Sequence, residues 1–200
     1  MIGIIGTAGR GEDSFTLSAR SFIKMSEIAR TIIEERLQVQ CHEADLISGG
    51  AAWADHIAAH AFVNGCGQSL SLALPCGWDD LRMQFVDNGS TDWRKNPGAT
   101  ANRHHLAFSA RCGINSLEEL HQLIAERRAD VLVGTGFHER NTFIAESADA
   151  LIAFTFGNGA TLKDGGTADT MGKFLKLNGP VGAFHVDLNT WEVYDDPVVP

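Results

Sequence analysis

One pattern constrains the fold of this chain most, and it occurs three times: a short apolar run is followed, directly or about ten residues later, by a glycine turn, and a helical pattern begins there. The three turns are GTAGRG at residues 6–11, GGA at 49–51 and GGT at 165–167. Short apolar runs indicate strands buried on both faces of a parallel sheet. Open α/β sheets bind ligands at the edge where such strands end. The three turns therefore predict one shared ligand crevice.

Strands and helices are expected to alternate along the chain. The expected strands are at about residues 2–6, 44–48, 69–74, 130–133, 150–154 and 181–185. The expected helices are at 18–37, 51–64, 116–128, 139–147 and 167–177. This alternation predicts an α/β fold of three layers, with a Rossmann-like, doubly wound, mostly parallel sheet. With 200 residues and no linker, we expect a single domain, residues 1–200.

Residues 76–113 depart from this alternation. The segment is polar and contains Gly89, Pro97 and Gly98, so we expect an irregular insertion. A loop of this length inside a compact domain is usually functional or partly helical. Two roles stay open: a lid over the crevice, or a family-specific surface or dimer element.

Composition excludes several classes of function. The chain has 16 Lys and Arg against 25 Asp and Glu, a formal net charge of −9, whereas general nucleic-acid binding needs clustered basic residues. No run approaches the roughly 20 apolar residues that cross a bilayer, and the amino terminus has no signal-peptide pattern. We therefore expect a cytoplasmic protein without membrane or general nucleic-acid partners.

The cysteines and histidines do not predict a metal or a cofactor. His56 and His60 are spaced to share one helix face, but Ile57 stands where zinc hydrolases carry a glutamate, and a third ligand is missing. Packed or solvated histidines are the simpler interpretation. No C-x-x-C pair or zinc spacing occurs, so we expect reduced, mostly buried thiols at all four cysteines: Cys41, Cys66, Cys76 and Cys112.

Five short motifs, taken in order, resemble one known superfamily. They are IIGTAGRG, SGGAAWAD, HERN, ADALIAF and GGTADT, and the resemblance runs from residue 3 to about residue 186 except for residues 76–113. The order is similar to the Rossmann-like SLOG superfamily, which includes Lonely guy type cytokinin phosphoribohydrolases, DNA-processing proteins and nucleotide-binding sensor domains. The resemblance implies a Rossmann-like fold, a nucleotide-derived ligand and a homodimer or higher homo-oligomer.

The resemblance fails at the catalytic position of the phosphoribohydrolases. Arg140 matches the Arg of their HERK-like motif, and Thr167 matches the Thr of their PGGxGT turn. Their Glu, three residues after that Thr, is replaced here by Thr170, and the nearest acid is Asp169. One residue rotates a side chain by about 100 degrees around a helix. The resemblance therefore favours binding over catalysis.

The candidate ligand-binding residues lie in the glycine turns and in the motifs beside them. Free N–H groups at a helix start bind phosphate, and a guanidinium forks onto two phosphate oxygens. The candidates are Gly6, Thr7, Ala8, Gly9, Arg10, Ser48, Gly49, Gly50, Ala51, Asp55, Arg140, Asn141, Gly165, Gly166, Thr167 and Asp169. Structural alternatives stay open for several of them. Arg10 is then a solvated loop arginine, Asn141 a helix cap, and Asp55 and Asp169 acids stabilised by a helix dipole.

These residues predict a protein that binds a nucleotide or ADP-ribose-like ligand at the carboxyl edge of the sheet, without efficient turnover. One alternative is a hydrolase of N-glycosidic bonds, in which Arg140 holds the phosphate and Asp169 or Glu139 stabilises the developing sugar cation. A second alternative is a sensor or sequestering protein for nucleotide immune signals. The missing glutamate favours the two binding interpretations over the enzyme.

Overall fold

The computed structural model describes residues 1–200 and is built around a seven-stranded sheet with the strand order β6-β3-β2-β1-β7-β8-β9. Every neighbouring pair is parallel except β8 and β9. The strands are β1 (Ile2–Gly6), β2 (Asp45–Ser48), β3 (Ser69–Leu74), β6 (Asp130–Val133), β7 (Ala150–Thr155), β8 (Ala183–Asp187) and β9 (Glu192–Tyr194).

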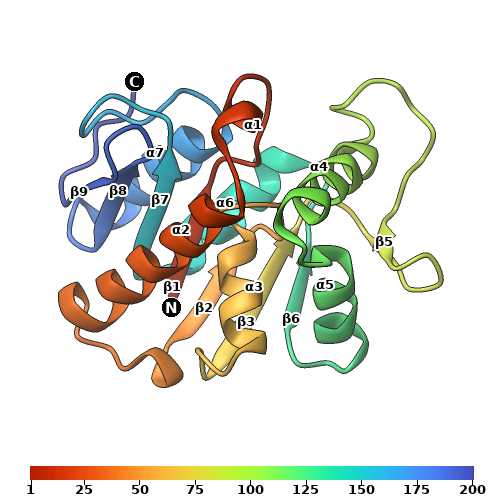
Figure 1. The fold of residues 1–200 in the computed structure, drawn as a ribbon, viewed down its shortest axis with the longest axis horizontal. Helices are drawn as coiled ribbons and strands as arrows, with labels where there is room; N and C mark the ends of the chain where they lie inside the picture. Colours follow the sequence, from red (N-terminus) through yellow and green to blue (C-terminus); the bar gives the residue numbers. More distant parts are fainter.

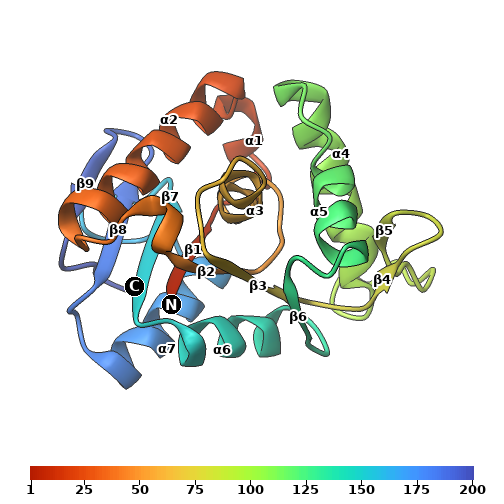
Figure 2. The same cartoon turned by 90° about the horizontal axis from the view of Figure 1, so that it is seen from below.

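Helices cover both faces of the sheet, which gives the three layers of a Rossmann-like α/β fold (Figure 1). Figure 2 shows α2 (Ala19–Thr31), α3 (His56–Val63), α4 (Pro97–Cys112) and α5 (Ser116–Ala125) on one face. Two helices, α6 (Phe137–Ser147) and α7 (Gly166–Asn178), cover the other face. None of the helices combines the length and apolar character that a membrane-crossing helix requires.

Shorter elements connect this framework. A four-residue helix α1 (Asp13–Thr16) follows β1, a π-helical turn (Ile32–Arg36) extends α2, and a 3-10 turn (Cys41–Glu43) precedes β2. Two short strands, β4 (Trp78–Asp79) and β5 (Gln84–Phe85), pair as a separate antiparallel hairpin.

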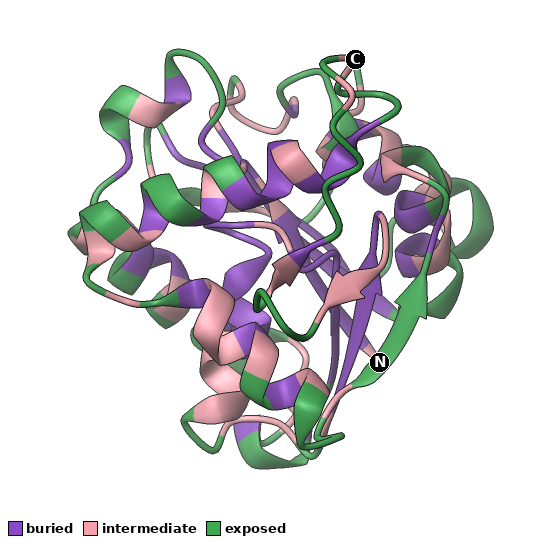
Figure 3. Ribbon diagram, turned by 90° about the vertical axis from the view of Figure 1, so that its right-hand side faces the viewer, coloured by how far each residue is buried: buried purple, intermediate pink, exposed green.

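The sheet divides the hydrophobic core into two parts. A cluster of 29 buried residues lies on the side of α2 to α5, and a cluster of 13 lies on the side of α6 and α7. In β7, Ile152 and Phe154 belong to the larger cluster, whereas Leu151 and Ala153 belong to the smaller. Burial on both faces explains the unbroken apolar run of this strand. The edge strand β6 is exposed, as its colour in Figure 3 shows.

Most predicted elements are confirmed within one or two residues. The largest shift among the helices is at 51–64, where the helix begins only at His56. The segment 76–113, expected to be irregular, contains the β4–β5 hairpin and the 16-residue helix α4. Asn96 caps this helix by accepting a hydrogen bond from the Ala99 N–H, a local signal that the sequence analysis did not use.

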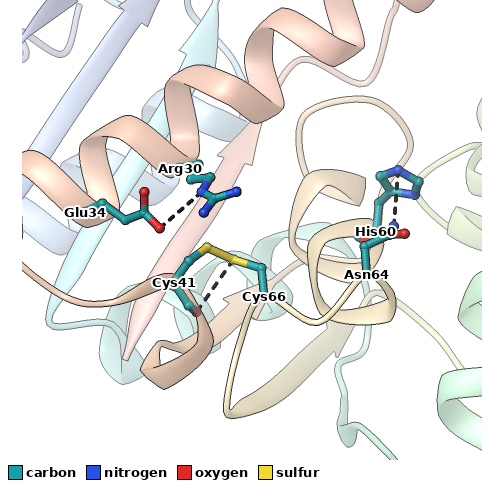
Figure 4. The surroundings of a disulfide bond; sticks show 6 residues. All are labelled: Arg30, Glu34, Cys41, His60, Asn64 and Cys66. Carbon is teal, nitrogen blue, oxygen red and sulfur yellow. Dashed lines mark hydrogen bonds and ion pairs between the residues drawn. A yellow bond between two sulfur atoms is a disulfide. The ribbon is translucent and has the colours of Figure 1, made fainter.

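The expectation of four reduced thiols is wrong for Cys41 and Cys66, which form a disulfide (Figure 4). Their Cα atoms lie 5.1 Å apart, within the usual range for a disulfide. The two cysteines lie on the segments that lead into β2 and β3, and these parallel neighbours begin at the same edge of the sheet. Their separation of 25 residues matches no motif, so only the fold brings them together. Cys76 and Cys112 are free thiols.

Candidate functional site

The candidate site lies at the carboxyl ends of β1 and β7, where the order of the strands reverses. The chain adds β2, β3 and β6 on one side of β1 and then returns to place β7 on the other side. The connections therefore leave in opposite directions, and a crevice forms between them. Doubly wound sheets bind ligands at such a switch point.

A cleft of about 180 Å³ opens at this point. It brings together the three glycine turns that the sequence analysis singled out. Nine predicted residues line it: Gly6, Thr7, Ala8, Arg10, Ala51, Arg140, Gly165, Gly166 and Thr167.

Sequence reasoning missed four residues of the same cleft: Asp13, Thr155, Lys163 and Asp164. Asp13 lies in the four-residue helix α1, and Lys163 lies in the long loop before α7. Lys163 Nζ is 2.5 Å from Asp13 Oδ1, and the Thr7 hydroxyl donates to Asp13 Oδ2 over 3.0 Å. These contacts join the loops that follow β1 and β7. Neither residue belongs to a motif, so their proximity depends on the fold.

Arg140 is a nearly buried side chain that is fixed from three sides. Its Nη1 lies 3.5 Å from Asp55 Oδ2 and 3.4 Å from the Gly49 carbonyl oxygen. Its Nε and Nη2 donate to Asn141 Oδ1 over 3.2 and 2.9 Å. The guanidinium is therefore held in one orientation at the wall of the cleft, where a planar group of fixed orientation recognises an oxyanion best.

Asp55 is buried behind this wall and joins the turns after β1 and β2. Its Oδ1 accepts the Gly6 N–H over 3.0 Å. Burial raises the pKa of Asp55, and the nearby Arg140 guanidinium and the Gly6 N–H act in the opposite direction. Asp55 does not line the cleft, so its contribution is to hold Arg140 and the Gly6 turn.

Gly49 permits this arrangement because it has no side chain. A Cβ atom at residue 49 would lie 2.5 Å from Asp55 Oδ2 and 2.6 Å from Arg140 Cζ. Contacts this short force one of the two charged side chains to move. The glycine is therefore required by the close approach of a buried ion pair.

Asn141 extends the network to α7. Its Nδ2 donates to the Gly166 carbonyl oxygen and to Asp169 Oδ2, each over 3.1 Å. Asp169 also accepts a hydrogen bond from Lys173 Nζ over 2.8 Å. Partial burial acts to raise the pKa of Asp169, but the hydrogen bonds from Lys173 and Asn141 outweigh it and lower the pKa. This carboxylate holds α7 against α6 and does not line the cleft.

The remaining predicted residues lie beside the cleft. Ser48 is buried and accepts the Gly50 N–H over 3.3 Å. Gly9 donates its N–H to the Thr7 hydroxyl over 3.1 Å, which shapes the turn after β1. Glu139 is exposed and accepts hydrogen bonds from the N–H and hydroxyl of Thr135, and these lower its pKa. Glu139 therefore does not face the cleft.

The helices fall into two groups by their first turn. Ser18, Asn96 and Asn115 cap α2, α4 and α5 with side-chain hydrogen bonds. The other helices, α1, α3, α6 and α7, have no side-chain cap, and α6 and α7 start after Gly136 and Gly165. The first N–H groups of an uncapped helix lack intrahelical partners. At α7, Gly165, Gly166 and Thr167 all line the cleft, so these groups are available to a ligand there.

His56 and His60 contact a carboxylate of the neighbouring helix. His56 Nε2 and His60 Nδ1 lie 2.8 and 3.0 Å from the Glu119 carboxylate of α5. Burial acts to raise the pKa of Glu119, but the hydrogen bonds from both histidines lower it to about 2. The pair therefore joins α3 to α5 and is outside the cleft.

Comparison with known proteins finds a similar protein of viral origin. No family model matches the chain, and no solved structure matches it significantly. Over 178 residues the chain is 34% identical to the uncharacterized protein R261 of Acanthamoeba polyphaga mimivirus, a match that covers 88% of this chain and 92% of the viral protein. The chain therefore belongs to the same protein family as this uncharacterized mimivirus protein.

Proposed function

We propose that the protein binds a nucleotide or ADP-ribose-like ligand in the cleft, with a phosphate group at the first turn of α7. The observation that carries this proposal is the uncapped start of α7, where Gly165, Gly166 and Thr167 line the cleft. The positive end of the helix dipole and free N–H groups bind phosphate at such positions.

The positive side chains of the cleft support an anionic ligand. Arg140 and Lys163 are paired with Asp55 and Asp13, whereas the Arg10 guanidinium makes no hydrogen bond or ion pair and lies over the Phe137 ring. Partial desolvation, followed by repulsion from Arg140, lowers the pKa of Arg10. A phosphate beside Arg10 and Arg140 would reduce this repulsion. The ligand is therefore expected to gain charge-assisted hydrogen bonds from these two guanidinium groups.

We also propose that the ligand is not turned over efficiently. Thr170 is buried, and its hydroxyl donates to the Gly166 carbonyl oxygen over 2.9 Å. The two acids suggested for a hydrolase, Asp169 and Glu139, do not line the cleft. A carboxylate that stabilises a developing sugar cation has to face that cation. Binding in a sensor or sequestering role fits this arrangement better than N-glycosidic hydrolysis.

Membership of the SLOG superfamily and assembly as a homo-oligomer are part of the same proposal. They rest on the order of the five motifs, four of which, IIGTAGRG, SGGAAWAD, HERN and GGTADT, contribute residues to the cleft.

Calorimetric titration tests the binding proposal. The probes are AMP, ADP and ADP-ribose, with uncharged adenosine as the reference compound. At least one phosphorylated probe should bind, and its affinity should fall as salt is added, because ionic strength screens the attraction. Adenosine should bind much more weakly. Equal binding of adenosine and the phosphorylated probes, or binding of none, would contradict the proposal.

A charge variant identifies the cleft as the place of binding. Lys163→Gln removes a cation from the cleft and should weaken a bound nucleotide roughly tenfold or more, since a hydrogen bond to a charged group contributes about 1.5–3 kcal/mol. Lys176→Gln removes the same charge from the exposed side of α7 and should leave the affinity nearly unchanged. Chromatography of the same mixtures after long incubation should recover the nucleotide intact.

A further inference from the structure

A second, smaller pocket adjoins the cleft. It shares Ala8, Arg10, Ala51 and Arg140 with the cleft, so the two arginines stand at the boundary between the two spaces. Its volume is about 10 Å³, which is room for about one water molecule. The pocket is therefore closed by the side chains around it.

Segment 76–113 supplies part of the far wall of the pocket, with both apolar and polar side chains. Phe85 belongs to β5, and Thr100, Ala101 and His104 occupy one side of α4. Phe137, at the start of α6, lines the pocket from the opposite side of the switch point. The segment that departs from the strand and helix alternation thus contributes directly to the neighbourhood of the candidate site.

This wall is held rigidly. Asn102 of α4 donates to the Phe85 carbonyl oxygen and accepts the Phe85 N–H, each over 2.9 Å. His105, also on α4, lies 3.0 Å from the Gly50 carbonyl oxygen in the turn after β2. The pocket wall therefore keeps a fixed position relative to the glycine turns of the cleft.

The ring of Phe137 is covered by two guanidinium groups. Arg10 Cζ and Arg140 Cζ lie 5.2 and 5.7 Å from its centroid. Arg140 is anchored by Asp55 and Asn141, but no hydrogen bond or ion pair holds the Arg10 guanidinium. A guanidinium stacked on an aromatic ring is planar, and a nucleobase stacks on such a ring in the same way. A planar group of a ligand can therefore replace the Arg10 guanidinium on the Phe137 ring at little cost in free energy.

We propose that this pocket is the base subsite of the ligand, in which a nucleobase stacks on Phe137 in place of Arg10 and Arg10 turns to the phosphate in the adjoining cleft. The inference rests on the proposed function and deepens it: the ligand is a nucleoside phosphate, and a sugar phosphate alone would leave the subsite empty. Because Arg10 lines both spaces, one movement opens the base subsite and adds a cation to the phosphate subsite.

His104 supplies polar recognition at this wall. Burial, together with the neighbouring Arg10 and Arg103, lowers the pKa of His104 to about 4. At neutral pH the imidazole is uncharged, so it has one donor and one acceptor nitrogen for the edge of a base. Thr100 adds a hydroxyl to the same wall.

The test compares probes with and without a base. Ribose 5-phosphate and the four nucleoside monophosphates AMP, GMP, CMP and UMP are titrated into the full chain by calorimetry. At least one nucleotide should bind tenfold or more tightly than ribose 5-phosphate. In Phe137→Leu this advantage should fall by about five- to hundredfold, because the stacking surface is lost, while ribose 5-phosphate binds as before.

A second variant distinguishes a blocked base subsite from a general loss of folding. Ala101→Leu adds volume to the pocket wall and should also abolish the advantage of the nucleotide, whereas Ala107→Leu, on an exposed position of the same helix, should not. Unchanged binding of ribose 5-phosphate reports an intact cleft in each variant. Equal affinities of ribose 5-phosphate and every nucleotide for the unaltered protein would overturn the base subsite but leave phosphate binding in place. Binding of none of the probes would overturn both proposals.

Discussion

Arg140 Nη1 lies 3.5 Å from Asp55 Oδ2, and the pair joins α6 to the residue that precedes α3, a helix on the opposite face of the sheet. Only 10% of the arginine side chain and 1% of the aspartate side chain are exposed. The pair links the turns after β1 and β2 to the start of α6, which are the segments that form the cleft. Arg140 therefore belongs both to the candidate phosphate site and to its structural support.

Arg140→Ala is expected to destabilise the unliganded protein by about 3–5 kcal/mol, because it leaves the Asp55 carboxylate buried and unpaired. The double variant with Asp55→Ala should lose less stability than the sum of the single variants. Chemical denaturation of the three variants measures this coupling. Arg36→Ala is the control: it breaks an exposed pair with Asp195 and should change stability by no more than about 0.5 kcal/mol. Equal effects of Arg140→Ala and Arg36→Ala would show that the buried pair contributes nothing.

Gly49→Ala tests the close approach around this ion pair. The added Cβ would lie 2.5 Å from Asp55 Oδ2, so the pair has to separate, and we expect a loss of about 3 kcal/mol or more. Gly172→Ala, within α7, places its Cβ at an ordinary 3.5 Å from Val199 and should be neutral or stabilising. Thermal melting compares the two. A Gly49→Ala protein that melts with the unaltered protein would mean that residue 49 tolerates a side chain.

His105 predicts a loss of stability on acidification. Burial, and next the neighbouring His56, lower the pKa of His105 from 6.5 to about 3, although the Gly50 carbonyl oxygen acts to raise it. Below the ordinary pKa the unfolded chain binds a proton that the folded protein does not, so stability falls as the pH falls. Between pH 7.5 and 5 this residue should account for about 2 kcal/mol.

Denaturation curves of His105→Gln at the two pH values measure this contribution. The variant should lose roughly that part of the pH dependence, and His42→Gln, at an exposed position, should retain it. Unchanged pH dependence in His105→Gln would indicate that His105 is protonated in the folded protein or is not buried.

The disulfide predicts the number of titratable thiols. In protein purified without reductant and then denatured, two thiols should react, those of Cys76 and Cys112, and all four after reduction. Cys41→Ser should lower the free energy of unfolding by about 3 kcal/mol, as expected for a loop of this length. Cys76→Ser is the matched control and should have a much smaller effect. Four reactive thiols before reduction would contradict the bond.

Local patterns were sufficient to predict the strands but not the contacts that the fold creates. The strands β1, β2 and β7 are rich in apolar residues and are therefore visible in the sequence. Glycine turns follow β1 and β2 directly, whereas the GGT turn comes about ten residues after β7. Helix α4 was missed because polar residues are distributed along it, and because Pro97 and Gly98, which form its first turn, were interpreted as marks of irregular structure. The Asn96 cap was the available signal.

The backbone turns that form the cleft were predictable from the sequence, but several of the side chains that line it were not. The glycine turns have to meet at the switch point of a doubly wound sheet, and they do. Asp13 and Lys163 are 150 residues apart and belong to no motif, so only the packing of two loops brings them together. Asp55 and Asn141 were identified from motifs as candidate ligand-binding residues, but both serve to position Arg140.

Native mass spectrometry of the freshly purified chain, alone and after addition of AMP, ADP and ADP-ribose, tests the central claim most directly. The claim is that the cleft at the end of β1 and β7 binds one nucleotide-like ligand. The account predicts a species heavier than the bare chain by one such ligand, which is lost or weakened in Lys163→Gln and retained in Lys176→Gln. Only the mass of the bare chain in every sample, or binding that is identical in the two lysine variants, would contradict it.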